Sequence, residues 1–401
     1  MLRFLRTAST RRLLATIAGA LAVIAGGTAI AVAATGSGPV PKAQPLANAV
    51  HQALSAPKVT GISANISFTN NLIDSSDFTG QTIDPVLQGA SGRLWLSDDG
   101  RLRIELQSDN GDAQVVVNHR SFWISDPTQN TVYEGTLPAE HRAQHGASDH
   151  GIPSIATIQS FLTGLMGKVN LSGAQPTDVA GRAAYRVTVS PKHDGGLLGS
   201  AQLAFDATRG VPLQFAIYAR GNTTPVLQLK ATSISYGSIP ASDLNISPPA
   251  GDKVVRLGTG AGASGVAAAG ARHTRADRRS VSGVKAVSAA VPFKLVAPTS
   301  LVGLPRQKVT QLMMGSERAA MVGYGENLGG MVVIERRADP HGSPTGGLGG
   351  LSLPTVSING AKGQELSTPL GTVLTFTRDG VSFTVLGSVP ATAAELAARA
   401  L

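Results

Sequence analysis

The stretch RLWLSDDGRLRIEL, residues 93–106, decides the fold of the first half of the chain. In both arms, 93–96 and 102–106, apolar and polar side chains alternate, which is the period of a β-strand with one buried face. Asp98-Asp99-Gly100 between the arms is typical of a tight hairpin turn. We therefore expect two adjacent antiparallel strands here.

Strand and helix patterns continue on both sides of this hairpin. Further strands are expected at 115–117, 122–124, 184–190, 201–206, 212–219, 226–236 and, as a terminal strand, 246–249. Two segments, 42–56 and 154–168, carry apolar residues at helical spacing and predict amphipathic helices. Strands with one apolar face and two helices with apolar stripes predict a mainly β, α+β domain over residues 41–250.

A second small α+β domain is expected over residues 291–401. Its strands are predicted at 319–324, 330–336, 355–359, 372–378 and 381–386, with a closing helix from Ala391. Residues 251–290 between the two domains are rich in Gly, Ala, Ser and Arg and contain no aromatic residue, so they are predicted to be a flexible linker. We expect the second domain to fold independently and to serve as a protein-contact module.

Residues 1–40 have the pattern of an export signal or membrane anchor. Four arginines in the first twelve residues precede 13–34, which contains no charged residue. As a helix this run would span about 33 Å, close to the hydrocarbon thickness of a bilayer. Ala31-Val32-Ala33 fits a signal-peptide cleavage site, so both cleavage and retention stay open. Either alternative predicts an extracytoplasmic protein, secreted or anchored to the cytoplasmic membrane.

The basic charge does not indicate nucleic-acid binding. The formal net charge is +9, of which residues 1–40 contribute +4 through four Arg. Residues 251–290 contribute +5, because seven basic residues stand against two acidic ones. The rest of the chain is electrically balanced and has no basic stripe with interleaved aromatics, so no nucleic-acid partner is expected.

The sequence shows no catalytic machinery. There is no Cys, which excludes disulfides, thiolate metal sites and a cysteine nucleophile. Gly260-x-Gly262-x-x-Gly265 lies in a low-complexity tract and is interpreted as linker rather than dinucleotide site. His141, His145 and His150 have the spacing of no familiar metal site and are interpreted as a solvated loop. We therefore expect a non-enzymatic protein with no catalytic residue, cofactor or metal.

Several motifs in residues 42–252 carry a family resemblance. They are WISDP at 123–127 with TVY at 131–133, VAGRxxYRV at 179–187, LAFDATxGxPL at 203–213, YG at 236–237 and PPxG at 248–251. In this order they resemble the LolA-like and RseB-like superfamily of envelope proteins. The tail VxGxVP, residues 385–390, resembles the small C-terminal domain of RseB-like sigma-regulatory proteins.

The resemblance implies an open curved antiparallel sheet, a half-barrel covered by helices. It also implies a non-enzymatic cell-envelope protein that binds lipid or lipoprotein acyl chains in an apolar cavity. The alternative is an RseB-like sensor that regulates a membrane anti-sigma factor by protein contact. The long linker departs from both families.

The candidate ligand-binding residues are apolar positions of the strands and of the second helix. They are Leu94, Leu96, Leu102, Ile104, Leu106, Phe122, Phe161 and Leu165. The alternative interpretation is that the helices fill the core and leave no cavity.

Overall fold

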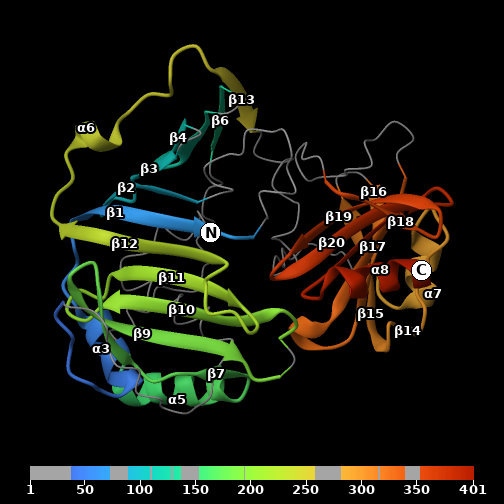
Figure 1. Cartoon of the computed structure of the whole chain (residues 1–401), viewed down its shortest axis with the longest axis horizontal. Helices are drawn as coiled ribbons and strands as arrows, with labels where there is room; N and C mark the ends of the chain where they lie inside the picture. The colour runs from blue at the N-terminus through green and yellow to red at the C-terminus, as the bar shows by residue number, and fades with distance from the viewer. Residues whose placement is uncertain are drawn as a thin grey trace. The chain divides into compact units, whose positions relative to one another are not determined.

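The computed structural model contains two compact units (Figure 1). The described residues are 38–72, 89–108, 111–127, 130–136, 153–193, 195–257, 281–314, 317–338 and 353–401. Strands dominate both units and helices are few, which confirms the predicted mainly β, α+β fold class. Residues 1–37 and 258–280 lie outside the described residues, and with them nearly all of the predicted export segment and the central part of the predicted linker.

The first unit is built on one thirteen-stranded sheet. Its strands are β1 (Gly61–Asn70), β2 (Gly89–Ser97), β3 (Leu102–Ser108), β4 (Gly111–Asn118), β5 (Ser121–Asp126), β6 (Thr131–Thr136), β7 (Val169–Leu171), β8 (Gln175–Val179), β9 (Arg182–Pro191), β10 (Leu198–Asp206), β11 (Pro212–Ala219), β12 (Leu227–Tyr236) and β13 (Lys253–Leu257). Their order is β13-β6-β5-β4-β3-β2-β1-β12-β11-β10-β9-β7, with β8 also paired to β9.

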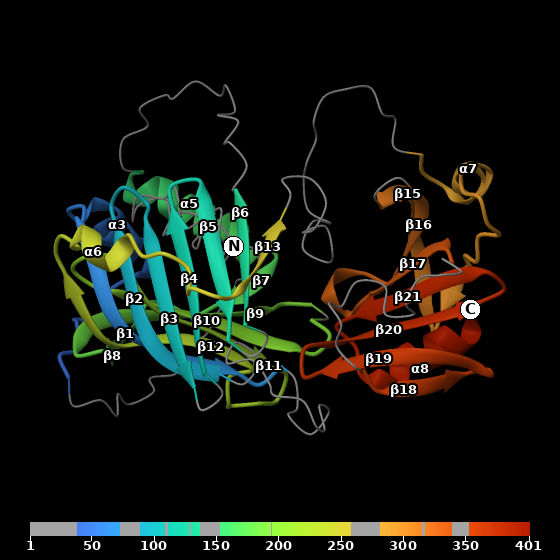
Figure 2. The ribbon, with the colours of Figure 1, turned by 90° about the horizontal axis from the view of Figure 1, so that it is seen from above.

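This sheet is curved and open. Figure 1 shows β9 to β12 broadside, whereas Figure 2, turned by 90°, shows β2 to β5 broadside, so the sheet bends around β1. The strands at the two ends of the order, β13 and β7, are not paired with each other in the part of the chain that the structure describes. Apart from β13, which pairs in parallel with β6, the arrangement is the open curved antiparallel sheet that the family resemblance implies.

Two helices cover one end of the sheet. They are α3 (Leu46–Ser55) and α5 (Ile155–Met166), both within the predicted helical segments. The hydroxyl of Ser154 accepts a hydrogen bond from the backbone N–H of Thr157 at 3.2 Å and so caps α5. The apolar stripes of both helices pack on Tyr185 and Val187 of β9 and on β10.

The motif around Asp206 closes the hairpin between β10 and β11. One carboxylate oxygen accepts hydrogen bonds from the backbone N–H groups of Thr208 and Arg209, at 2.8 and 2.9 Å. The other accepts from the Tyr236 hydroxyl at 2.7 Å. Burial opposes the charge, but these hydrogen bonds outweigh it and lower the pKa of Asp206 below its usual value. The motif that carries part of the family resemblance is therefore a turn fixed by a buried carboxylate.

Two predictions along this region are corrected by the structure. Residues 246–249, predicted as a strand, form none, because Pro248-Pro249 cannot donate backbone hydrogen bonds to a ladder. A short helix, α6 (Ala241–Leu244), precedes them. The strand lies further on, at β13, which pairs in parallel with β6 and falls inside the predicted linker.

At the other end of the predicted linker, α7 (Val284–Ala290) buries Val287 completely in the second core. The predicted linker is therefore wrong at both ends, since residues 253–257 pair with β6 and Val287 packs in a core, which average composition conceals.

The second unit holds an eight-stranded sheet. Its strands are β14 (Ser300–Leu301), β15 (Leu304–Met314), β16 (Glu317–Tyr324), β17 (Met331–Arg337), β18 (Thr355–Ile358), β19 (Ala361–Thr368), β20 (Gly371–Arg378) and β21 (Val381–Gly387), in the order β14-β15-β16-β17-β21-β20-β19-β18. A 3-10 turn, η2 (Asn327–Gly329), precedes β17, and the closing helix is α8 (Ala391–Ala400), as predicted. The sequence did not indicate β15 and β19, whose outward positions carry many polar residues.

A carboxyl group is buried in this second core. Glu335 on β17 is fully buried, and its side chain accepts a hydrogen bond from the backbone N–H of Val296 at 2.9 Å. Its other oxygen has no hydrogen-bond partner among the described residues. Burial raises the pKa of Glu335 to about 7, although the hydrogen bond from Val296 opposes the rise.

The stability of the second unit should therefore depend on pH. Because the folded-state pKa of Glu335 is raised, its contribution is present below the unfolded-state pKa and is lost as pH rises through about 7. At 1.36 kcal/mol per pKa unit, unfolding of this unit should become easier by about 3 kcal/mol between pH 4.5 and pH 7.5. Urea unfolding at several pH values measures this slope.

Glu335→Gln should remove most of this dependence, because the amide does not titrate. Glu317→Gln on the exposed end of β16 is the matched control and should leave it intact. A pH slope that persists in Glu335→Gln would show that another group is responsible.

Candidate apolar binding site

The cross-strand register gathers apolar side chains on one face of the first sheet. Residues directly opposite one another in antiparallel strands share a face. One row across β1 to β5 joins Ile62, Leu96, Leu102, Val117 and Phe122. The next row, reaching β6, joins Ala64, Leu94, Ile104, Val115, Ile124 and Tyr133. We call this surface the apolar face.

The opposite face of the same strands is covered by the chain itself. The guanidinium of Arg103 lies 4.8 Å from the ring centroid of Trp95 and pairs with Glu105. It also donates a hydrogen bond to the carbonyl oxygen of Asp243 at 3.0 Å, which attaches α6 to β3. Further along the segment that follows α6, Ile246 packs on a cluster formed by β4, β5 and β6. This reverse face is therefore occupied by polar pairs and by the chain's own segment, in contrast to the apolar face.

Six of the eight predicted site residues lie together on the apolar face. Leu102 and Leu106 are buried, with 3% and 8% of their surface exposed. The other four, Leu94, Leu96, Ile104 and Phe122, are only half-buried and pack against one another and against these two. A core side chain would be enclosed by neighbours from a second layer, and among the described residues these four are not.

The two predicted helix residues lie elsewhere. Leu165 is buried, but in the cluster that joins α3 and α5 to β9 and β10. Phe161 is 48% exposed and belongs to none of the buried clusters of the described residues. The buried stripe of α5 runs through Ile158 and Leu162, and the apolar spacing in the sequence could not separate this stripe from the position of Phe161.

The apolar face also includes residues that the sequence analysis missed. Phe68 of β1 lies opposite Ala90 of β2 and Leu229 of β12, and Leu229 in turn lies opposite Phe215 of β11. Leu229 is 39% exposed. The signal was present in residues 61–70, where Ile62, Ala64, Ile66 and Phe68 alternate with polar residues. The apolar face thus extends from β11 across β1 to β6.

The described residues contain no group of three or more His, Cys, Asp or Glu side chains placed to hold a metal. Two candidate motifs of the sequence lie outside the described ranges: the glycines at 260, 262 and 265, and the histidines at 141, 145 and 150. Within those ranges, no helix is both long enough and apolar enough to cross a bilayer.

Comparisons with known proteins give remote structural similarity only. No protein-family model and no curated protein matches the chain. The complex structure of Pseudomonas aeruginosa MucA/MucB is 17% identical, with 88% of this chain and 94% of that chain covered and a TM-score of 0.39. A putative outer membrane lipoprotein-sorting protein domain from Vibrio parahaemolyticus is 10% identical, with 50% of this chain and 96% of that chain covered and a TM-score of 0.22. An uncharacterized conserved protein from Thermus thermophilus is 12% identical, with 53% and 97% covered and a TM-score of 0.32.

The chain is thus similar to a MucB structure, of the RseB-like kind, and to a lipoprotein-sorting domain, of the LolA-like kind, which are the two families that its motifs resemble. The sequence identities and TM-scores are too low to transfer a site from these structures. The apolar face is therefore defined only by the strand registers and side-chain burial of this chain.

Replacing leucines of the apolar face by alanine should show which of them lie in a filled core and which lie at an open surface. Leu102→Ala, at a buried position, should lower the free energy of unfolding by about 2–5 kcal/mol. Leu94→Ala, at a half-buried position in the neighbouring row, should cost less than half as much, because its side chain already meets solvent. Urea unfolding of the two variants measures both costs. Equal costs would show that the face is an enclosed core and leaves no room for a ligand.

Proposed function

We propose that residues 41–257 bind the acyl chain of a lipid or lipoprotein on the apolar face, without chemical turnover. The observation that supports this proposal is the set of half-buried apolar side chains from β1 to β6, opposite a reverse face that the chain covers with its own segment. Contiguous apolar surface of this kind marks a binding site on a soluble domain.

The energetics favour an acyl chain as the ligand. Burial of about 16 methylenes contributes roughly 13 kcal/mol gross, at about 0.8 kcal/mol each. Losses of translational freedom and ordering of the chain offset a large part of this gain. The remainder supports binding without a single polar contact, which suits a face whose rows hold only aliphatic and aromatic side chains.

The proposed place of action is the cell envelope. It rests on residues 1–40, in which arginines precede an uncharged segment long enough to span a bilayer. Export with cleavage would release a soluble carrier of acyl chains. Retention would hold the apolar face near the membrane that supplies its ligand.

The alternative is a sensor that regulates a membrane anti-sigma factor by protein contact. It is supported by the second unit, which has its own core and its own sheet and is not needed to complete the apolar face. Met313 and Leu328 of this unit are about half exposed and offer apolar contacts to a protein partner.

A charge placed on the apolar face tests the proposed function. Ile104→Asp should weaken binding of a fluorescent long-chain fatty acid at least 10-fold, because an ionised carboxylate would have to be desolvated beside the acyl chain. Titration of the folded variant by fluorescence measures the affinity. Gln107→Asp, on the same strand but with its side chain on the reverse face, is the matched control and should bind normally.

Two outcomes would count against acyl-chain binding at this face. One is a folded Ile104→Asp variant with unchanged affinity. The other is a wild-type protein that binds no fatty acid but binds the extracytoplasmic part of an anti-sigma factor, which would favour the sensor.

A further inference from the structure

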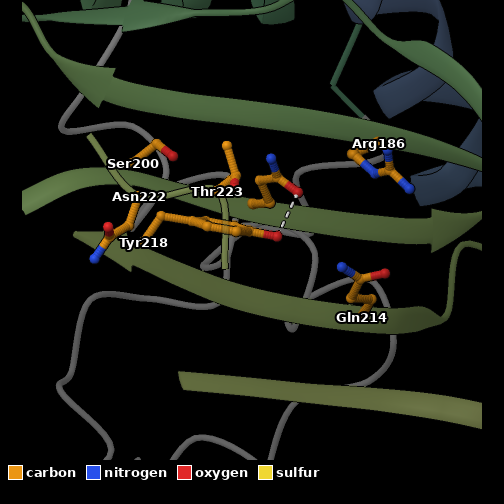
Figure 3. A pocket seen from close by; sticks show the side chains of 7 residues that line it. Arg186, Ser200, Gln214, Tyr218, Asn222 and Thr223 are labelled. Carbon is orange, nitrogen blue, oxygen red and sulfur yellow. Dashed lines mark hydrogen bonds between the residues drawn. The ribbon is translucent and has the colours of Figure 1, made fainter. Parts of the chain in front are cut away.

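A polar pocket lies on the first unit, away from the apolar face. It has a volume of about 390 Å³ and is formed by side chains of β9, β10 and β11 together with the turn that follows β11 (Figure 3). This volume falls in the range of small-molecule sites.

Strand alternation places this pocket on the side of the sheet opposite the apolar face and the helices. On β11, Phe215 pairs with Leu229 on the apolar face, so Gln214 is directed to the other side. On β9, Tyr185 and Val187 pack under α3 and α5, so Arg186 between them is likewise directed away from the helices. An acyl chain on the apolar face and a ligand in this pocket would therefore not compete.

Two polar side chains in the pocket use only part of their hydrogen-bonding capacity within the protein. Gln214 is only 7% exposed, yet its carboxamide forms no hydrogen bond with another described residue. Arg186 donates one hydrogen bond, from Nη2 to the Thr177 hydroxyl at 3.2 Å, while its Nε is buried without a partner among the described residues. Buried polar groups are normally satisfied, because an unpaired one costs free energy. A bound ligand that accepts and donates hydrogen bonds would remove this cost.

The remaining lining residues supply neutral donors and acceptors. The hydroxyl of Tyr218 donates to the side-chain oxygen of Gln202 at 3.3 Å, which leaves the amide N–H groups of Gln202 free to donate. Burial raises the pKa of Tyr218, although the positive charge of Arg186 opposes the rise, so the hydroxyl stays neutral. Every lining side chain is polar, Arg186 is the one charged group among them, and none is acidic.

The groups are arranged along the pocket with the charge at one end. Figure 3 shows Arg186 and Gln214 at one end and Ser200, Asn222 and Thr223 at the other, where the ring of Tyr218 also lies with its hydroxyl directed toward the middle. A guanidinium recognises a carboxylate or phosphate, and carboxamides and hydroxyls bind hydroxyl groups. The aromatic ring of Tyr218 supplies a flat surface, and none of the lining residues offers an aliphatic subsite.

We propose that this pocket binds a small acidic saccharide, with its acidic group on Arg186 and its hydroxyls on Gln202, Gln214 and the hydroxyl-bearing end. The shared chemistry is a sugar ring that carries a carboxylate or a phosphate. This site is independent of the proposed acyl-chain site, because the two lie on opposite faces of the sheet.

Calorimetric titration of the whole protein tests the proposal with three probes, glucuronate, glucose 6-phosphate and glucose. At least one acidic sugar should bind about 10- to 100-fold more tightly than glucose, the gain expected from charge-assisted hydrogen bonds. Arg186→Gln should reduce the affinity for that sugar to the level of glucose. Arg93→Gln, an exposed arginine on β2, is the matched control and should change nothing. The comparison of the two acidic sugars tells a carboxylate ligand from a phosphate ligand.

A second variant keeps the proposal testable if Arg186→Gln does not fold. Gln214→Ala removes a carboxamide that has no partner among the described residues, so the variant should stay folded. It should weaken binding of the same sugar several-fold. The proposal is overturned if neither acidic sugar binds at millimolar concentration. It is also overturned if either variant is folded by circular dichroism and binds with wild-type affinity.

Discussion

The register between β2 and β3 is the constraint on which the apolar face depends. The backbone N–H of Ser97 donates to the carbonyl oxygen of Arg101 at 3.0 Å, and Gly100 adopts a positive φ of 87° that closes the turn. Asp99 holds the turn through its ion pair with Arg101 at 2.8 Å. A slip of β3 by one residue would move Ile104 to the reverse face and bring Arg103 and Glu105 to the apolar one. The short turn therefore fixes which side chains a ligand meets.

The same alternation gives the sheet two sides with different chemistry. On the strands β2 to β5, the reverse side holds Arg103, Trp95 and Glu105 and is covered by the segment around α6. On β9 to β11, that side carries the polar pocket, while the opposite residues of β9 and β10 pack under the two helices. One curved sheet can therefore present an apolar surface and a polar pocket without either disturbing the other.

Much of the first unit was predictable because its information is local. The hairpin at 93–106 and the two helices follow from alternation, turn residues and helical spacing. Strand β13 was missed because it pairs with β6, more than a hundred residues earlier, and its own sequence has little to mark it. Strands β15 and β19 were missed because the polar residues on their exposed sides mask the alternation.

The strand residues of the candidate site were also predictable, because their pattern is local in the sequence. Its strand residues share a period of two, whereas the position of Phe161 depends on which stripe of α5 meets β9 and β10. The polar pocket could not be predicted, since Arg186, Gln202 and Gln214 come from three strands and no local motif joins them.

Methyl NMR of the protein with a spin-labelled stearic acid tests the central claim most directly, because it reports which face the acyl chain touches. Binding to the apolar face should broaden the methyl signals of Leu94, Ile104 and Ile124, which lie in one row. The signals of Val116 and Val132, on the reverse side beneath Ile246, should broaden less because they lie farther from the label. Stronger broadening of Val116 and Val132 than of Leu94 and Ile104, or no broadening on either side, would contradict the account.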